Sequence, residues 1–164
     1  MTIIDSDEND VVQDWKWADG YVQQVKKILK ENTMHMIAID DSSPEQDMKE
    51  STDLVVKTMA GKVAVRIRRA NCQYRDLTIR SWRASGAKTE LPKIKEGFGD
   101  FYLYAWEDKN SELSNWILVN LDTLRKSGLL ENRRTILNPD GITGFINITV
   151  AELRLSGCLT AYCL

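Results

Sequence analysis

The sequence predicts an α/β or α+β fold in which one central mixed β-sheet is flanked by helices. Its 164 residues, 43% of them hydrophobic, are enough for one domain with a substantial core. Helical and strand-like hydrophobic periods alternate along the chain, which is typical of mixed sheets with helices packed against them. We therefore divide the chain into an acidic N-terminal tail, residues 1–18, and a single α/β domain, residues 19–164.

The first predicted element is a helix that begins after Asp19 and ends near Asn32. Aspartate is a residue type that caps helix N-termini. Apolar side chains then recur at the spacing that places one stripe against a core, at Tyr21, Val22, Val25, Ile28 and Leu29. A short extended run at residues 34–39 and a polar loop follow.

Residues 53–59 and 62–69 predict an antiparallel hairpin that turns at Ala60-Gly61, because both runs are rich in β-branched residues. Side chains alternate between the two faces of a strand. One face of the second strand should therefore be core, with Val63, Val65 and Ile67. The other face should be a basic stripe, with Lys62, Ala64, Arg66 and Arg68.

The rest of the chain alternates strands and short helices. Strands are predicted at residues 75–82, 100–108, 115–121 and 145–149, and helices at residues 88–96, 123–128 and 150–157. Gly97 should end the first of these helices, and Asp122 should cap the second. Thr149 and Glu152 have the spacing of a capping box, which should begin the third.

The net charge of −2 conceals an uneven distribution along the chain. Residues 1–53 carry 13 acidic and 5 basic side chains, whereas residues 62–95 carry 10 basic and 2 acidic ones. If the basic side chains share one face, that face attracts phosphates with an affinity that depends on salt. The alternative is a solvated basic surface that the acidic N-terminal segment neutralises.

Several classes of protein are disfavoured. No apolar stretch reaches the roughly 18 residues that span a bilayer, and the first 20 residues are acidic where a signal peptide is basic and then apolar. We expect a cytoplasmic protein without membrane association. Three cysteines without a CxxC pair indicate neither a disulfide framework nor a zinc site. Neither glycine-rich nucleotide-binding motif is present.

The order of these elements resembles the restriction-endonuclease-like fold of the PD-(D/E)XK nuclease superfamily. The resemblance rests on an N-terminal helix, TDLVV at a strand entrance, VAVRIRR on its hairpin partner, a short helix and another apolar strand, over roughly residues 19–130. The same segments resemble small proteins encoded by phages and prophages. The resemblance implies a nuclease, or a relative of one that binds nucleic acid.

In that superfamily the first aspartate, and an acid two residues before a lysine, ligate a divalent metal. Asp53 matches the aspartate, but Ala64 stands in place of the acid and Arg66 in place of the lysine. Alanine cannot bind a metal, and arginine stays protonated and cannot act as a base. Some members place the acid on the following helix, where Glu90 lies. The resemblance thus implies a catalytic set of Asp53, Glu90 and Arg66, and an Mg²⁺ or Mn²⁺ site formed by Asp53, Glu90 and Glu50.

The basic residues beyond Arg66 are candidates for contacts with nucleic acid: Arg68, Arg69, Arg80, Arg83, Lys88 and Lys93. Trp82 lies among them and can stack on a base if it is exposed. Each candidate also has a structural alternative. Arg66 and Arg68 can pair with acids, Glu90 can favour a helix N-terminus or pair with a lysine, and an indole is often core packing.

Three functions remain, in this order: nucleic-acid binding without established catalysis, an Mg²⁺- or Mn²⁺-dependent nuclease that acts on DNA or RNA, and a phage protein that binds or inhibits a host protein. The departures at Ala64 and Arg66 favour binding over cleavage. The type of nucleic acid and the oligomeric state stay open.

Overall fold

The computed structural model describes residues 16–32, 38–41, 54–57, 61–72 and 74–164, with only the backbone for 38–41 and 54–57. The chain divides into two compact units, residues 1–34 and residues 35–164. Helices and strands are mixed, which confirms the predicted fold class. The boundary at residue 18 between a tail and a single domain stays a prediction.

The first unit contains helix α2, Val22–Asn32, which ends where predicted. The predicted cap at Asp19 is wrong, because residues 16–19 are themselves helical and a turn at residues 20–21 separates them from α2. Val25 and Leu29, four residues apart on one face, are buried. Near the end of the helix the Asn32 side chain donates a hydrogen bond to the Ile28 carbonyl at 2.8 Å, which occupies one of the carbonyls left over at a helix end.

The second unit is built on a six-stranded mixed sheet in the order β1-β2-β3-β5-β6-β9. The strands are Ala38–Asp41, Leu54–Lys57, Gly61–Arg68, Phe101–Trp106, Asn115–Asn120 and Leu159–Cys163. Strands β2 and β3 pair antiparallel, as predicted. Strands β3 and β5 pair parallel, so the chain crosses between them through β4 and α4. Every other neighbouring pair in this sheet is antiparallel.

A second, three-stranded antiparallel sheet has the order β4-β8-β7, with strands Leu77–Arg83, Thr143–Ile148 and Ile136–Leu137. The register of β4 against β8 shifts between Arg80 and Trp82. The sequence indicates the strands β4 and β8 but not their separation from the main sheet, because alternation predicts a strand and not its partner. Strands β7 and β9 are absent from the prediction.

Three short helices complete this unit: α4, Glu90–Lys95, α5, Leu121–Lys126, and α6, Val150–Leu155. The predicted capping box at Thr149 and Glu152 is confirmed. The predicted cap at Asp122 is wrong. The Asn120 side chain accepts the Thr123 N–H instead, because the helix begins at the end of β6 and places Asp122 inside its first turn. Asp122 there pairs with Lys126.

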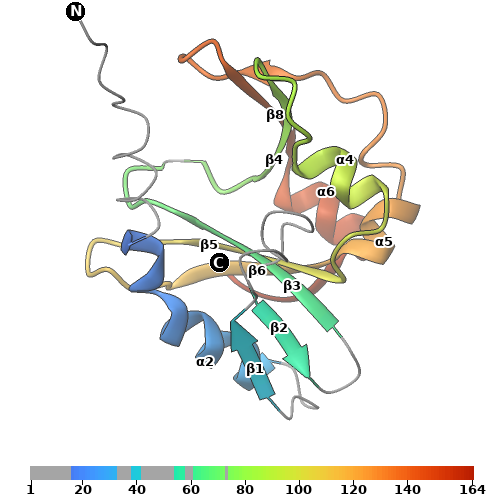
Figure 1. The fold of residues 1–164 in the computed structure, drawn as a ribbon. Coiled ribbons are helices and arrows are strands. Elements are labelled where there is room, and N and C mark those ends of the chain that lie inside the picture. The colour runs from blue at the N-terminus through green and yellow to red at the C-terminus, as the bar shows by residue number, and fades with distance from the viewer. Residues whose placement is uncertain (1–15, 33–37, 42–53, 58–60, 73) are drawn as a thin grey trace, which may run out of the picture. The chain divides into compact units, whose positions relative to one another are not determined.

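The main hydrophobic core joins both sheets and all three short helices. Its buried members include Leu77 and Ile79 of β4, Tyr102, Tyr104 and Trp106 of β5, Ile117 and Val119 of β6, and Ile146 and Ile148 of β8. Helix α4 packs on β4, and α5 packs on β5 and β6 (Figure 1). No helix in the described part of the chain is long and apolar enough to cross a bilayer.

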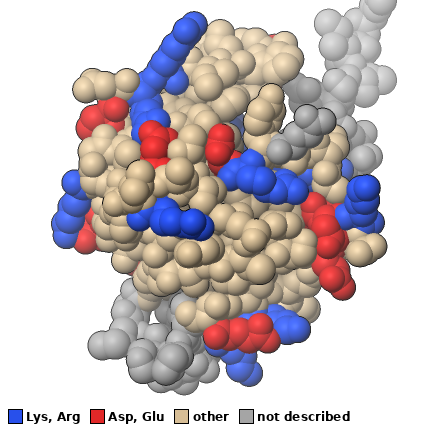
Figure 2. All heavy atoms as spheres, turned by 180° about the vertical axis from the view of Figure 1, so that it is seen from behind, with Lys and Arg blue, Asp and Glu red and all other residues tan. Residues whose placement is uncertain are grey.

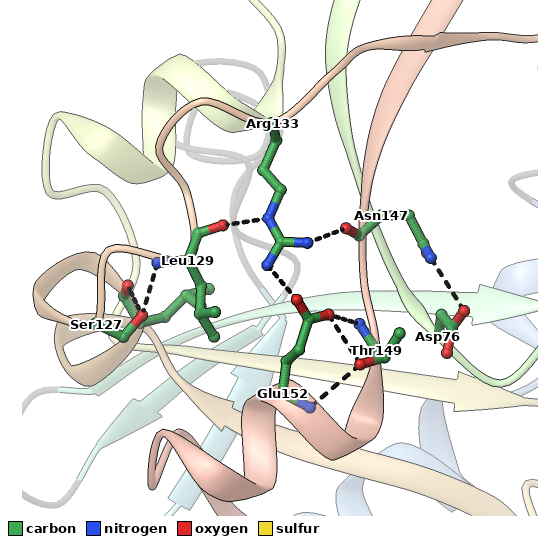
Figure 3. Close-up of polar contacts among 8 residues, drawn as sticks. Asp76, Ser127, Leu129, Arg133, Asn147, Thr149 and Glu152 are labelled. Atoms are coloured by element: carbon green, nitrogen blue, oxygen red, sulfur yellow. Dashed lines mark hydrogen bonds and ion pairs between the residues drawn. The ribbon is translucent and has the colours of Figure 1, made fainter.

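A polar network ties the small sheet to α6 (Figure 3). The Arg133 guanidinium donates to the Leu129 carbonyl at 2.9 Å, to the Asn147 carbonyl at 3.2 Å, and to Glu152 at 2.6 Å. The second oxygen of Glu152 accepts the Thr149 N–H at 2.8 Å. These hydrogen bonds, that from Arg133 first, lower the pKa of Glu152 from its usual value of 4.5 to about 2.

Candidate nucleic-acid interface

Two of the residues implied by the resemblance meet in the structure. Arg66 lies on β3 and Glu90 is the first residue of α4, and one guanidinium nitrogen of Arg66 is 3.0 Å from each carboxylate oxygen of Glu90. The two side chains are 23% and 24% exposed. The alternative in which Glu90 pairs with a nearby lysine does not apply to Lys88, which pairs with Glu96.

Glu90 also binds the edge of the small sheet. Its Oε2 accepts the backbone N–H of Arg80 at 2.9 Å, and Arg80 lies on β4, the outermost strand of that sheet. A backbone N–H that is removed from water needs an acceptor. One carboxylate therefore satisfies that N–H and pairs with Arg66 of the larger sheet, so it connects the two sheets through the start of α4.

The electrostatics of Arg66 follow from this position. Burial opposes its charge, but the Glu90 carboxylate and the Tyr102 and Tyr104 hydroxyl groups outweigh that effect and raise its pKa above the usual arginine value. Burial is also the first cause that raises the pKa of Tyr102 and of Tyr104. The Tyr104 hydroxyl and the Thr78 hydroxyl are 2.6 Å apart and share a hydrogen bond. Arg66 therefore stays charged in a site walled by two neutral phenols.

The predicted basic stripe on β3 needs correction. Register places Arg66 beside Tyr104 and Ala64 beside Tyr102, and both tyrosines belong to the main core. Val63, on the opposite face, is also buried. A strand with a parallel neighbour is usually covered on both faces, so this arginine face is only partly open to solvent.

Three arginines nevertheless interact here, and we name Arg66, Arg80 and Arg83 the arginine cluster. Burial is the first cause that lowers the pKa of Arg80, and the positive charge of Arg66 is the second. Glu90 acts in the opposite direction, and Arg83 adds a smaller lowering. Arg68 acts electrostatically on Tyr104. Within the described residues, the side chains of Arg68, Arg80 and Arg83 form no hydrogen bond or ion pair.

Two carboxylates face the cluster from neighbouring elements. Glu90 is bound to Arg66. Asp140 interacts electrostatically with Arg80, and its oxygens accept hydrogen bonds from the Ile142 and Thr143 N–H groups and the Thr143 hydroxyl. These turn contacts lower the pKa of Asp140, so it stays charged. Three guanidinium groups against two carboxylates leave the cluster with an excess of one positive charge.

The other predicted residues divide between those the structure describes and those it does not. Arg69 follows β3, Lys88 pairs with Glu96, and Lys93 lies within α4. Asp53 and Glu50 lie outside the described residues, so the predicted approach of Asp53 to Glu90 stays a prediction. Among the residues that are described, no group of three acidic, histidine or cysteine side chains is arranged to hold a metal ion.

Sequence reasoning missed the contribution of the tyrosines and of Asp140. Tyr102 and Tyr104 are buried beside the guanidinium of Arg66. The parallel register of β3 and β5 brings them there, and only a model of strand pairing could have revealed it. Asp140 lies in a turn, where aspartate is common because its side chain hydrogen-bonds nearby backbone N–H groups. Its position in the sequence therefore gives no sign that it also interacts with Arg80.

The surface is not uniformly basic. On the face seen in Figure 2, lysine and arginine side chains are separated by neutral surface and accompanied by acidic ones. No continuous basic face is visible in that view.

Comparison with known proteins adds little to this description. No protein-family model matches the chain, and no curated protein matches it. Among solved structures, the crystal structure of MepB is similar with a TM-score of 0.35 and 16% sequence identity, covering 77% of this chain and 76% of that one.

Proposed function

We propose that this protein binds nucleic acid through the arginine cluster. The observation that carries the proposal is the environment of Arg80, which lies near two other guanidinium groups and forms no ion pair of its own among the described residues. Grouped positive charges repel one another. A phosphate placed among them relieves that repulsion, and guanidinium groups match phosphate oxygens in geometry.

The arrangement of the strands supports the same proposal. The hairpin of β2 and β3, then helix α4 and strand β5, has the element order on which the resemblance to restriction-endonuclease-like proteins rests, with strand β4 of the small sheet inserted between β3 and α4. The described strand β2 begins at Leu54, directly after Asp53 in the sequence, and Leu54 pairs with Val63. Since a fold hosts many functions, the proposal rests first on the arginines.

Binding ranks above cleavage because of the bonds that Glu90 already makes. Its two oxygens accept hydrogen bonds from Arg66 and from the Arg80 N–H, so a cation at this carboxylate would lie beside a guanidinium group. The described residues thus do not fit an Mg²⁺ or Mn²⁺ site. Titration of the protein with Mn²⁺, beside Asp53→Ala, tests the nuclease alternative, and micromolar binding lost in the variant would restore it.

The binding proposal is tested by removing charge from the cluster without changing the fold. Arg80→Gln combined with Arg83→Gln removes two positive charges, and Lys126→Gln combined with Arg154→Gln removes two from helices α5 and α6. Anisotropy of labelled DNA and RNA at about 50 mM salt should show at least about ten-fold weaker binding for the first variant only. Equal affinity of the two variants, or no binding by the unaltered protein, would refute the proposal.

A further inference from the structure

We infer that a hollow beside strand β7 binds a carboxylate that carries an apolar chain, with a medium-chain fatty acid as the simplest example. The inference goes beyond the proposed function and is independent of it. Strand β7 lies at one edge of the small sheet, and β4, the strand of Arg80 and Arg83, lies at the other. A ligand at β7 therefore needs no residue of the arginine cluster.

The hollow exists because β7 is short. Only Ile136 and Leu137 pair with β8, and residues 133–135 before them are not part of a strand. Residues 133–137 and Asn147 of β8 line a hollow of about 650 Å³. Sites for small molecules commonly have volumes of about 300–1,000 Å³, so the hollow is large enough for a ligand of that class.

Apolar side chains contribute much of the lining. Ile136 is 45% exposed and Leu137 is 58% exposed, although edge strands are usually protected by charged side chains. A Cβ built on Gly144 would lie 2.7 Å from the Thr135 methyl and 3.2 Å from a Leu137 methyl. The side chains of Thr135 and Leu137 therefore lie against the β8 backbone, where the glycine leaves room for them, and their apolar atoms are available to an alkyl chain.

The two arginines of the lining differ in their partners. Figure 3 shows the Arg133 guanidinium bound to the Leu129 and Asn147 carbonyls and to Glu152, which lies 2.6 Å away and compensates its charge. Arg134 is exposed, and within the described residues its side chain forms no hydrogen bond or ion pair. The hollow therefore carries one uncompensated positive charge, that of Arg134.

This charge beside apolar side chains is complementary to a carboxylate on an apolar chain. No acidic side chain is among the lining residues. The guanidinium group presents its donors in a fork that matches two carboxylate oxygens, and the removal of methylene groups from water favours binding of the chain. A hydrocarbon without charge would leave Arg134 unpaired, and a small anion without a chain would leave the apolar side chains exposed. A free acid and the C-terminus of a peptide both supply the required chemistry.

Isothermal titration with sodium hexanoate, octanoate and decanoate tests the inference. Affinity should rise by about two- to four-fold for each added methylene group. Arg134→Gln should weaken octanoate binding by about ten-fold or more, and octanol should bind the unaltered protein more weakly than octanoate by a similar factor. Arg154→Gln replaces an exposed arginine of α6 and is the matched control, which should leave octanoate binding unchanged. Thermal unfolding checks that each variant folds.

Amide chemical shifts locate the ligand, and the largest changes with octanoate should occur at residues 133–137 and Asn147. A peptide that ends in leucine distinguishes the two sources. If it binds more tightly than octanoate, and amidation of its C-terminus removes that binding, the hollow takes a chain terminus. The inference is overturned if neither acid nor peptide binds, if octanol binds as tightly as octanoate, if Arg134→Gln has no effect, or if the largest shift changes lie elsewhere. None of these outcomes involves the arginine cluster, so the proposed function is tested separately.

Discussion

Replacing Glu90 with alanine tests the structural basis of the candidate site. The substitution removes the ion pair with Arg66, at 3.0 Å, and the acceptor of the Arg80 N–H, at 2.9 Å. Two charges about 4 Å apart attract by about 4 kcal/mol at an effective dielectric constant of 20, before the cost of desolvation. Exposed ion pairs contribute about 0–1 kcal/mol to stability, whereas removing one partner of a fully buried pair costs about 3–5 kcal/mol. The pair of Arg66 and Glu90 is partly exposed, so its contribution should lie between these two cases.

We therefore expect Glu90→Ala to lower the free energy of unfolding by about 3 kcal/mol, of which about 1 kcal/mol comes from the Arg80 N–H that loses its acceptor. A double-mutant cycle with Arg66→Ala isolates the ion pair, and its coupling energy should be about 1–3 kcal/mol. Urea denaturation followed by circular dichroism measures each variant.

The control cycle uses Asp122 and Lys126, an exposed pair one helical turn apart on α5 with 2.6 Å between its charged atoms. Its coupling energy should be about 0.3–0.5 kcal/mol, as for other exposed helix pairs. If the coupling of Arg66 with Glu90 is no larger than that of the control pair, the ion pair does not connect the two sheets as described.

Three further results are expected. Arg80→Gln should change the free energy of unfolding by no more than about 0.5 kcal/mol, because the repulsion from Arg66 and Arg83 that it removes is offset by the lost attraction to Glu90 and Asp140, and a marked loss in urea denaturation would contradict this. Glu152→Gln should lower the free energy of unfolding near pH 7. Because the pKa of Glu152 is lowered to about 2 in the folded protein, the difference in free energy of unfolding between the unaltered protein and the variant should shrink as pH falls from 4.5 towards 2. If that difference stays constant in acid denaturation, the bond between Glu152 and Arg133 does not contribute as described. Gly144→Ala should lower the free energy of unfolding by about 1–2 kcal/mol and so lower the melting temperature. The added Cβ would lie 2.7 Å from the Thr135 methyl and 3.2 Å from the Ile136 carbonyl oxygen. An unchanged melting temperature would show that the neighbouring atoms move aside without cost.

Local patterns in the sequence predicted local structure well. The helix at 22–32 follows from apolar spacing, the hairpin of β2 and β3 from β-branched runs around a turn, and the start of α6 from the capping box at Thr149 and Glu152. Each signal lies within about a dozen consecutive residues. The strands β7 and β9 are short and lack such a signal, so they became visible only through their partners.

The candidate site was harder to predict because it depends on pairing between distant segments. Sequence reasoning selected Arg66 and Glu90 individually, through the resemblance, but not as a pair that is 24 residues apart in the chain. The sequence predicts a basic stripe on β3 but not the tyrosines that cover it, because alternation shows which side chains share a face and not what packs on that face. The parallel strand β5 brings two buried tyrosines beside Arg66.

The salt dependence of nucleic-acid binding tests the central claim most directly. On single strands, each phosphate contact contributes about 0.7 to the slope of log K against log salt concentration. If Arg80 and Arg83 each contact a phosphate, the Arg80→Gln and Arg83→Gln double variant should lose about 1.4 from that slope, while the Lys126→Gln and Arg154→Gln control keeps it. An equal slope for both variants and the unaltered protein would contradict a phosphate-binding arginine cluster.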